Sequence, residues 1–138
     1  MIKSLSQIIE SAEAQKTPEA QAKILMNNSS KALKDCIGYA MDPNVKWLLP
    51  SSDPPYRPMP ESADQEGRLY NETRRLIYFV DSPDGRALTN IRREQIFIQL
   101  LESIDLNDAK LMLRIKNHSL TLDMKAVKIA FPNLAKNW

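Results

Sequence analysis

The chain has few of the residues from which catalytic and metal-binding centres are usually built. Its 138 residues include one cysteine, Cys36, and one histidine, His118. A single cysteine excludes an internal disulfide and a zinc site made of cysteine ligands. A metal ion at His118 would have to take its other ligands from carboxylates. We therefore predict that the protein binds no metal and no cofactor.

Glycine is also scarce, with three isolated residues, Gly38, Gly67 and Gly85. Phosphate-binding loops such as G-x-G-x-x-G need several closely spaced glycines, so a standard nucleotide-binding loop is excluded. A nucleophile pair of Cys36 and His118 is the remaining catalytic alternative. Burial in the core is the more common role of an isolated cysteine. We predict that the protein is not an enzyme.

Long apolar runs are missing as well. No window approaches the roughly 18 consecutive apolar residues of a membrane span. The N-terminal segment MIKSLSQIIESAEAQ is interrupted by Glu10 and Glu13, unlike the apolar region of a signal peptide. The expected location is the cytoplasm, with no membrane contact.

What the chain does contain is a series of amphipathic helical patterns. Apolar residues recur at helical spacing in 2–14, 18–26, 31–41, 90–104, 106–116 and 124–130. Residues suited to cap a helix start precede most of these segments: Ser4 or Ser6, Thr17, Ser29 or Ser30, Asp105 and Asp123. The pattern predicts an all-α fold, a single compact domain over 1–138 with five to seven helices.

Two segments carry more specific expectations. Residues 63–80 fit a helix, but the end of this segment is rich in β-formers and a turn follows it, so a short β-hairpin near 76–90 is the alternative. The segment 90–104 is the clearest helix. Its residues expected to face the core are Ile91, Phe97, Leu100, Leu101 and Ile104.

The long connection between helices is rich in proline. Six of the nine prolines lie within 39–60. Proline removes a backbone donor and fixes φ, so this strip is neither a helix interior nor a central strand. We call residues 43–60 the strap, and expect it to follow an extended, polyproline-like course.

The strap has two interpretations. Its P-x-x-P motif, from Pro55 to Pro58, suits the aromatic grooves of adaptor domains, which makes Trp47, Tyr56 and Arg57 candidate partner-binding residues. Alternatively, the aromatic residues pack onto the protein's own helices, and the prolines reduce the entropy lost on ordering. We favour packing onto the protein itself, and partner binding requires Tyr56 and Arg57 to point outward.

Positive charge is concentrated towards the C-terminal end. Residues 109–138 contain six Lys/Arg and one Asp, a net charge of +5, whereas the whole chain carries +2. The candidate phosphate-binding residues are Arg74, Arg75, Arg92, Arg93 and Arg114, supported by Lys110, Lys116, Lys125 and Lys128. The competing interpretation is that the arginine doublets pair with interleaved acids, namely Glu72, Asp81 and Glu94.

Three blocks of sequence resemble a known group of proteins. They are DPNVKWLLPSSDPPYRP, RREQIFIQLLESIDLNDAKLMLRIKN and VKIAFPNL, and the similarity extends over about 32–134. In order and spacing they resemble an uncharacterised family encoded by T-even-type tailed phages, common among marine cyanophages. The resemblance implies a viral source, and a location in the cytoplasm of an infected bacterium or in the virion. It implies no catalytic residues, and His118 stands where a lysine-rich turn would be expected.

Two functions are compatible with these observations. We expect a non-enzymatic accessory or assembly protein of a phage that acts by binding another protein. The alternative is a nucleic-acid-associated factor in phage replication or transcription, which rests on the basic residues. The apolar helix 91–104 is compatible with a monomer or with an interface between two copies.

Overall fold

The protein is built from helices joined by one long irregular segment. A computed structural model describes residues 3–60 and 67–138. In chain order the elements are α1 Leu5–Glu13, α2 Pro18–Asn27, α3 Lys31–Met41, α4 Leu69–Glu72, the 3-10 helix η1 Thr73–Phe79, α5 Pro83–Arg86, α6 Asn90–Ser103, α7 Leu106–Lys116 and α8 Met124–Ala130. The predicted all-α class is confirmed. Within the described ranges, six α-helices have seven residues or more, and α4 and α5 are single turns.

Most helices begin where the sequence predicts, because their caps are local features. The Ser4 side chain accepts from the Gln7 backbone N–H, and the Gln7 side chain accepts from the Ser4 backbone N–H, which is a capping box. The other predicted caps found in place are Thr17, Ser30, Asp105 and Asp123. Each satisfies an N–H that would otherwise lack a partner at the helix start.

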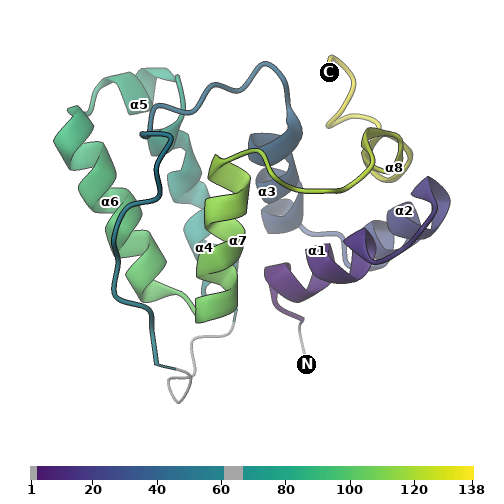
Figure 1. The fold of residues 1–138 in the computed structure, drawn as a ribbon. Coiled ribbons are helices and arrows are strands. Elements are labelled where there is room, and N and C mark those ends of the chain that lie inside the picture. The colour runs from purple at the N-terminus through teal and green to yellow at the C-terminus, as the bar shows by residue number, and fades with distance from the viewer. Residues whose placement is uncertain (1–2, 61–66) are drawn as a thin grey trace.

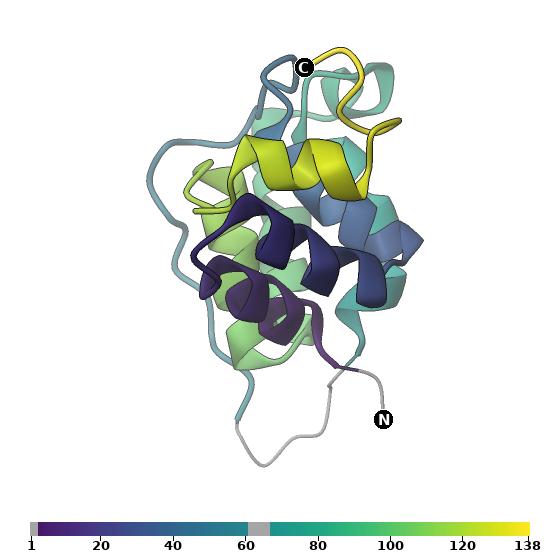
Figure 2. The same ribbon diagram turned by 90° about the vertical axis from the view of Figure 1, so that its right-hand side faces the viewer.

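The helices form two groups around a shared core. α1, α2 and α8 lie side by side on one side of the molecule, and α5, α6 and η1 lie on the other, with α3 and α7 between them (Figures 1 and 2). The core is apolar and draws on both groups. Its fully buried side chains include Leu5, Leu33, Cys36, Phe79, Phe97, Leu101 and Met112. The expected burial of Cys36 is confirmed.

The β-hairpin alternative for 76–90 is wrong. Residues Thr73–Phe79 form a 3-10 helix, and Val80 makes a single antiparallel bridge with Trp47 of the strap. The backbone N–H of Leu48 donates to the carbonyl of Phe79 at 2.8 Å. The predicted helix 63–80 begins in the described part only at Leu69, and its residues 63–66 lie outside the described ranges.

One predicted core residue is misplaced. Ile91 is 73% exposed, whereas Arg93, two positions later, is 4% exposed. The buried stripe of α6 passes through Arg93, Phe97 and Leu100, which lie three or four residues apart on one face. A residue two positions from this stripe points to the opposite side of the helix.

No helix within 3–60 and 67–138 is both long and apolar enough to cross a membrane.

Candidate binding surface at the end of α3

The C-terminal end of α3 is where two irregular segments meet: the strap and the link 117–123 after α7 (Figure 1). The last carbonyls of a helix have no partner within the helix. Here the indole Nε1–H of Trp47 donates to the carbonyl of Tyr39 at 2.9 Å, and the Nδ1 of His118 lies 2.8 Å from the carbonyl oxygen of Ala40. One ring from each segment therefore caps the same helix end.

Trp47 fixes the start of the strap to the core. Its ring stacks on Phe79, with centroids 6.4 Å apart and planes 12° apart, and meets the edge of Tyr39 at 6.5 Å. Aromatic contacts of this kind add to the stabilisation from burial. Of the three candidate partner-binding residues of the strap, Trp47 and Tyr56 are half-buried against the core and Arg57 is exposed.

Lys116 fixes the middle of the strap. Its side chain is 2% exposed, and its ammonium donates to the carbonyl of Pro50 at 3.0 Å and to Oδ1 of Asn117 at 2.9 Å. The carboxylate of Asp53 lies 3.4 Å from the same nitrogen and also accepts from Asn117 at 2.9 Å. A buried ammonium needs several acceptors of this kind.

The role of Lys116 was missed at the sequence level, where it counts only as a cation of the basic C-terminal region. A signal existed. Lys116 follows Ala109 by seven residues and Met112 by four, so it lies on the buried face of α7. Helix periodicity identifies this buried position, but it does not identify the strap carbonyls that a buried lysine binds there.

The end of the strap is bound through its backbone. The N–H of Arg57 donates to Oε2 of Glu102, near the end of α6, at 2.8 Å. The strap thus runs along α6 and is held at its start, middle and end (Figure 1). This geometry agrees with packing onto the protein itself.

The five candidate phosphate-binding arginines have different surroundings. Arg93 is buried and donates to the carbonyls of Gly85 at 2.6 Å and Leu88 at 2.9 Å. It does not pair with Glu94, as the ion-pair interpretation expected. Arg75 does pair with Glu72, at 2.9 Å.

Arg114 forms two hydrogen bonds to Glu13 of α1, at 2.9 and 2.6 Å. Burial alone would raise the pKa of Glu13, but the hydrogen bonds from Arg114 and Thr121 outweigh it and hold the pKa below its ordinary value of 4.5. Arg74 and Arg92 are exposed. Three of the five arginines are therefore engaged with other groups of the protein.

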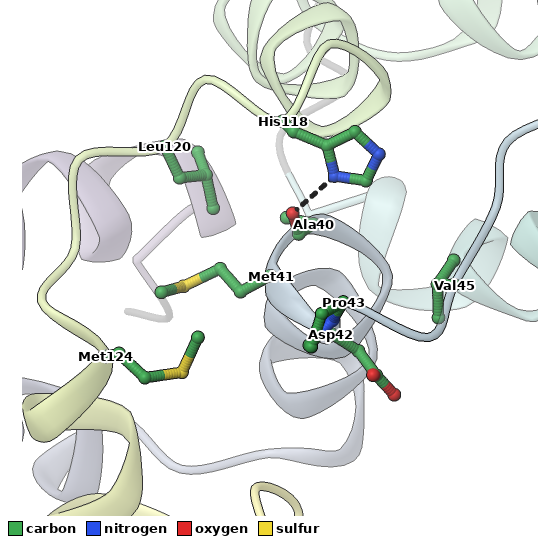
Figure 3. A pocket seen from close by; sticks show the side chains of 8 residues that line it. All are labelled: Ala40, Met41, Asp42, Pro43, Val45, His118, Leu120 and Met124. Atoms are coloured by element: carbon green, nitrogen blue, oxygen red, sulfur yellow. Dashed lines mark hydrogen bonds between the residues drawn. The ribbon is translucent and has the colours of Figure 1, made fainter. Parts of the chain in front are cut away.

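A hollow opens beside His118, with a volume of about 420 Å³. Its lining comes from the end of α3, the start of the strap, the link 117–123 and the start of α8: Ala40, Met41, Asp42, Pro43, Val45, His118, Leu120 and Met124. We call it the His118 hollow. The side chains of Met41, Leu120 and Met124 converge from three segments, and His118 lies above the end of α3 (Figure 3). Methionine side chains adapt readily to the shape of a partner.

The backbone of His118 adopts a conformation that usually belongs to glycine. Its φ is 54°, in the left-handed region. The N–H of His118 donates to the carbonyl of Ile115 at 3.2 Å, and the N–H of Ser119 donates to that of Arg114 at 2.9 Å. These two bonds form a Schellman motif, which ends α7. A positive φ is less favourable for histidine than for glycine, but histidine places an imidazole at the rim of the hollow.

The hydrogen bond of His118 determines which ring nitrogen remains available. A carbonyl oxygen only accepts, so Nδ1 carries the proton and, in the neutral ring, Nε2 is an acceptor. Nε2 points away from Ala40 (Figure 3). Asp42, the C-cap of α3, also lines the hollow, and its carboxylate points away from the His118 ring (Figure 3); its Oδ1 accepts from the backbone N–H of Asn44 at 2.8 Å.

A second cluster of titratable groups is buried at the start of α7. Asp108 is 1% exposed, and its Oδ1 accepts from the backbone N–H of Ser6 at 3.1 Å. Burial first, and then the neighbouring Asp105, raise the pKa of Asp108 to about 7, although the hydrogen bonds with Ser6 act in the opposite direction. Burial also raises the pKa of the Cys36 thiol, so the thiol is neutral. Neither side chain lines the His118 hollow.

No group of three or more His, Cys, Asp or Glu side chains suited to a metal ion occurs among the residues that the structure describes. The model of a family of unknown function, DUF6433, matches residues 8–122, well over half of the chain. None of the curated proteins and none of the solved structures matches.

Proposed function

Because the chain belongs to a family of unknown function, DUF6433, we propose its function from its geometry: it is a non-enzymatic protein that binds another protein through the His118 hollow. The observation that carries this proposal is the hollow itself. It is open and about 420 Å³ in volume, within the range of roughly 300–1,000 Å³ typical of ligand sites. Its floor is apolar and its rim polar, as in protein interfaces.

The surroundings of the two candidate catalytic residues support a non-enzymatic role. Cys36 is completely buried, and its thiol is kept neutral first by burial and then by the nearby negative charge of Asp108. His118 uses Nδ1 to bind the carbonyl of Ala40. A nucleophilic cysteine needs a thiolate and an adjacent base, and neither arrangement suits that chemistry.

The proposal includes a setting. The resemblance of 32–134 to a family of T-even-type phages supports an accessory or assembly role during infection. The partner is then a protein of the virus or of its bacterial host, met in the cytoplasm or in the virion. This part of the proposal rests on the resemblance alone.

Affinity purification with matched variants tests the proposal. Tagged wild type, Met124→Trp and Arg57→Ala are used as baits in extracts of infected cells. Met124→Trp fills the hollow, and Arg57→Ala changes an exposed residue of the strap. We expect a partner that is captured by the wild type and by Arg57→Ala, and lost with Met124→Trp. Capture that survives Met124→Trp but fails with Arg57→Ala would refute the hollow as the binding site. Circular dichroism confirms that each variant folds.

The second candidate function is nucleic-acid binding, and exposed cations favour it. Arg74, Arg92, Lys110, Lys125 and Lys128 are exposed. Binding of a DNA or RNA oligonucleotide is measured over a salt series, because contacts to phosphates weaken steeply with salt. A steep slope that is reduced in Arg92→Ala would favour this function, and no binding at low salt would eliminate it.

A further inference from the structure

Exposed lysines gather on the side of the molecule that α2 and α8 form. We propose that the outer surface of α2, α8 and the start of α3, which we call the lysine face, binds the phosphate backbone of duplex DNA without reading its sequence. This inference rests on the second candidate function, nucleic-acid binding, and adds to it the surface and the kind of nucleic acid.

Three helical segments bring the lysines together. α2 and α8 lie side by side (Figure 2), and the backbone N–H of Asp123, the N-cap of α8, donates to Oε1 of Gln21 in α2 at 2.9 Å. The start of α3 adjoins the end of α8, because the ammonium of Lys34 lies 5.6 Å from the ring centre of Phe131. The exposed lysines of these segments and of the turn before α2 are Lys16, Lys23, Lys31, Lys34, Lys125 and Lys128.

These segments carry a positive charge that the rest of the chain does not. Residues 16–35 and 123–130 contain six lysines and three acidic residues, a net charge of +3, whereas the remainder of the chain carries −1. Of the acids, Asp35 is paired with Lys31 at 3.0 Å, and Asp123 accepts from a backbone N–H as the cap of α8. The other five lysines form no salt bridge within 3–60 and 67–138, so their charge is available to a partner.

Most arginines, in contrast, are engaged with groups of the protein. All eight lie within 57–114. Those that form salt bridges are Arg68, Arg75, Arg86 and Arg114. Arg93 is buried against backbone carbonyls. The exposed Arg74 and Arg92 belong to η1 and α6, on the other side of the molecule from α2 and α8 (Figure 1).

The composition of the lysine face favours duplex nucleic acid over other anionic partners. Lysine is depleted in protein–protein interfaces, whereas protein–DNA interfaces are strongly positive. Neither α2, PEAQAKILMN, nor α8, MKAVKIA, contains an aromatic residue, and single strands are bound largely by stacking their bases on aromatic rings. A lysine ammonium is a point charge rather than a planar fork, so it suits phosphates, and phosphate contacts carry no sequence information.

An anionic membrane fits the lysine face less well, because the apolar sides of α2 and α8 are packed into the core. Leu25 and Val127 are completely buried. The large apolar side chains that these helices expose are Met26 and Ile129, each by about half. A helix that lies on a membrane presents a broad apolar side to the lipid, rich in Trp, Phe or Leu.

Fluorescence anisotropy with a labelled DNA duplex of random sequence, about 20 base pairs long, tests the inference over a salt series. The ten-residue α2 is about 15 Å long, the axial length of about four base pairs. We therefore expect about four phosphate contacts, and an affinity that falls about a hundredfold between about 50 and 200 mM salt. A single strand of equal length should bind more weakly, and polyglutamate at equal charge should not displace the duplex.

Paired substitutions locate the contacts. Lys125→Gln with Lys128→Gln should weaken duplex binding about tenfold at low salt and lower the salt slope by about two, because two phosphate contacts are lost. Lys125→Arg with Lys128→Arg keeps both charges and should bind like the wild type. Arg74→Gln with Arg92→Gln removes two exposed charges from the other side of the molecule, and as the matched control it should also bind like the wild type.

The outcomes separate the inference from nucleic-acid binding in general. If the arginine pair weakens binding and the lysine pair does not, or if a single strand binds more tightly than the duplex, the inference fails while the second candidate function stands. Displacement by polyglutamate would indicate an acidic protein segment as the partner and would also overturn the inference. If neither duplex nor single strand binds at low salt, both are refuted.

Discussion

The strap and the link 117–123 cross the same end of α3, and they cap it with different kinds of ring. Each sends one ring to cap a carbonyl: Trp47 donates to Tyr39, and His118 donates to Ala40. The indole of Trp47 has a single N–H and no acceptor, so its hydrogen bonding is complete. The imidazole of His118 has a second nitrogen, which points away from the helix (Figure 3). The capping bond of Trp47 therefore uses the only polar group of its ring, whereas His118 keeps Nε2 outside its capping bond.

The two segments also differ in what lies beneath them. The strap lies on aromatic rings and on Lys116, which binds its carbonyls. The link 117–123 lies beside a hollow with a methionine floor. Of the strap's candidate partner-binding residues, Trp47 and Tyr56 are half-buried against the core and Arg57 is exposed. His118, which the sequence analysis considered only as a metal ligand or as a partner of Cys36, lies at this hollow.

The largest expected effect on stability comes from a substitution in the strap. Trp47→Ala should lower the free energy of unfolding by about 3–4 kcal/mol, because it removes a stacked ring and a capping hydrogen bond. Met124→Ala, at the open hollow, should cost about 1 kcal/mol, because that side chain has empty space beside it. Urea denaturation measures both. Equal losses would contradict the distinction between the two segments.

Helix α7, which carries Lys116 and precedes the link 117–123, contains a residue whose effect on stability is independent of binding. Asp108 lies in the first turn of α7, and its pKa of about 7 is above the ordinary value of 3.8. Between these values the folded state keeps a proton that the unfolded state releases. The contribution of Asp108 to stability is therefore complete below about pH 4, and is lost as pH rises to about 7.

Asp108→Asn should remove this dependence. Its side-chain oxygen can still accept from Ser6, and its amide can donate to Asp105. The variant should be more stable than the wild type by about 3 kcal/mol at pH 8, and about equal at pH 4. Thermal unfolding at both values checks this. A variant that is less stable than the wild type at pH 8 would show that ionised Asp108 is not unfavourable. Capture of the partner by the tagged protein should not change.

Loosening the middle of the strap should have a smaller effect. Lys116→Met keeps the length of the buried stem and removes the ammonium that binds the strap. We expect a loss of about 2 kcal/mol and faster amide exchange in 50–58, since the released carbonyls can be hydrated. Lys110→Met, at an exposed position of the same helix, is the control and should change neither. Unchanged exchange in 50–58 would mean that Lys116 does not hold the strap.

The smallest effect on stability is expected at His118, in the link 117–123. His118→Gly loses one hydrogen bond, worth about 1 kcal/mol, and gains a similar amount because glycine adopts a positive φ without strain. Its net change should be below about 0.5 kcal/mol. His118→Ala loses the bond without that gain, so it should be about 1 kcal/mol less stable than His118→Gly. If His118→Ala were more stable than His118→Gly, the positive φ at residue 118 would be contradicted.

The features that the sequence predicts well are local. Ser4, Thr17 and Asp105 cap helices through neighbours two or three residues away, which the sequence displays directly. Ile91 was misjudged because an arginine, Arg93, occupies the buried stripe, and hydrophobicity does not identify a buried arginine.

The candidate site was less accessible to prediction because its contacts are distant in sequence. His118 meets Ala40 across 78 positions, and Lys116 meets Pro50 across 66. Periodicity indicates on which face of a helix a residue lies, but not which carbonyl it reaches. For the strap, prolines and aromatics predict a segment without regular structure, but not the rings and carbonyls that it contacts.

The central claim is that binding occurs at the His118 hollow and that the strap serves the fold. Nuclear magnetic resonance tests it most directly, with ¹⁵N-labelled wild-type protein titrated with the partner protein identified by affinity purification. We predict that the amide shifts gather in 40–46 and 117–124 and leave 50–58 unchanged. Shifts that gather in 50–58, with 117–124 unchanged, would contradict the account.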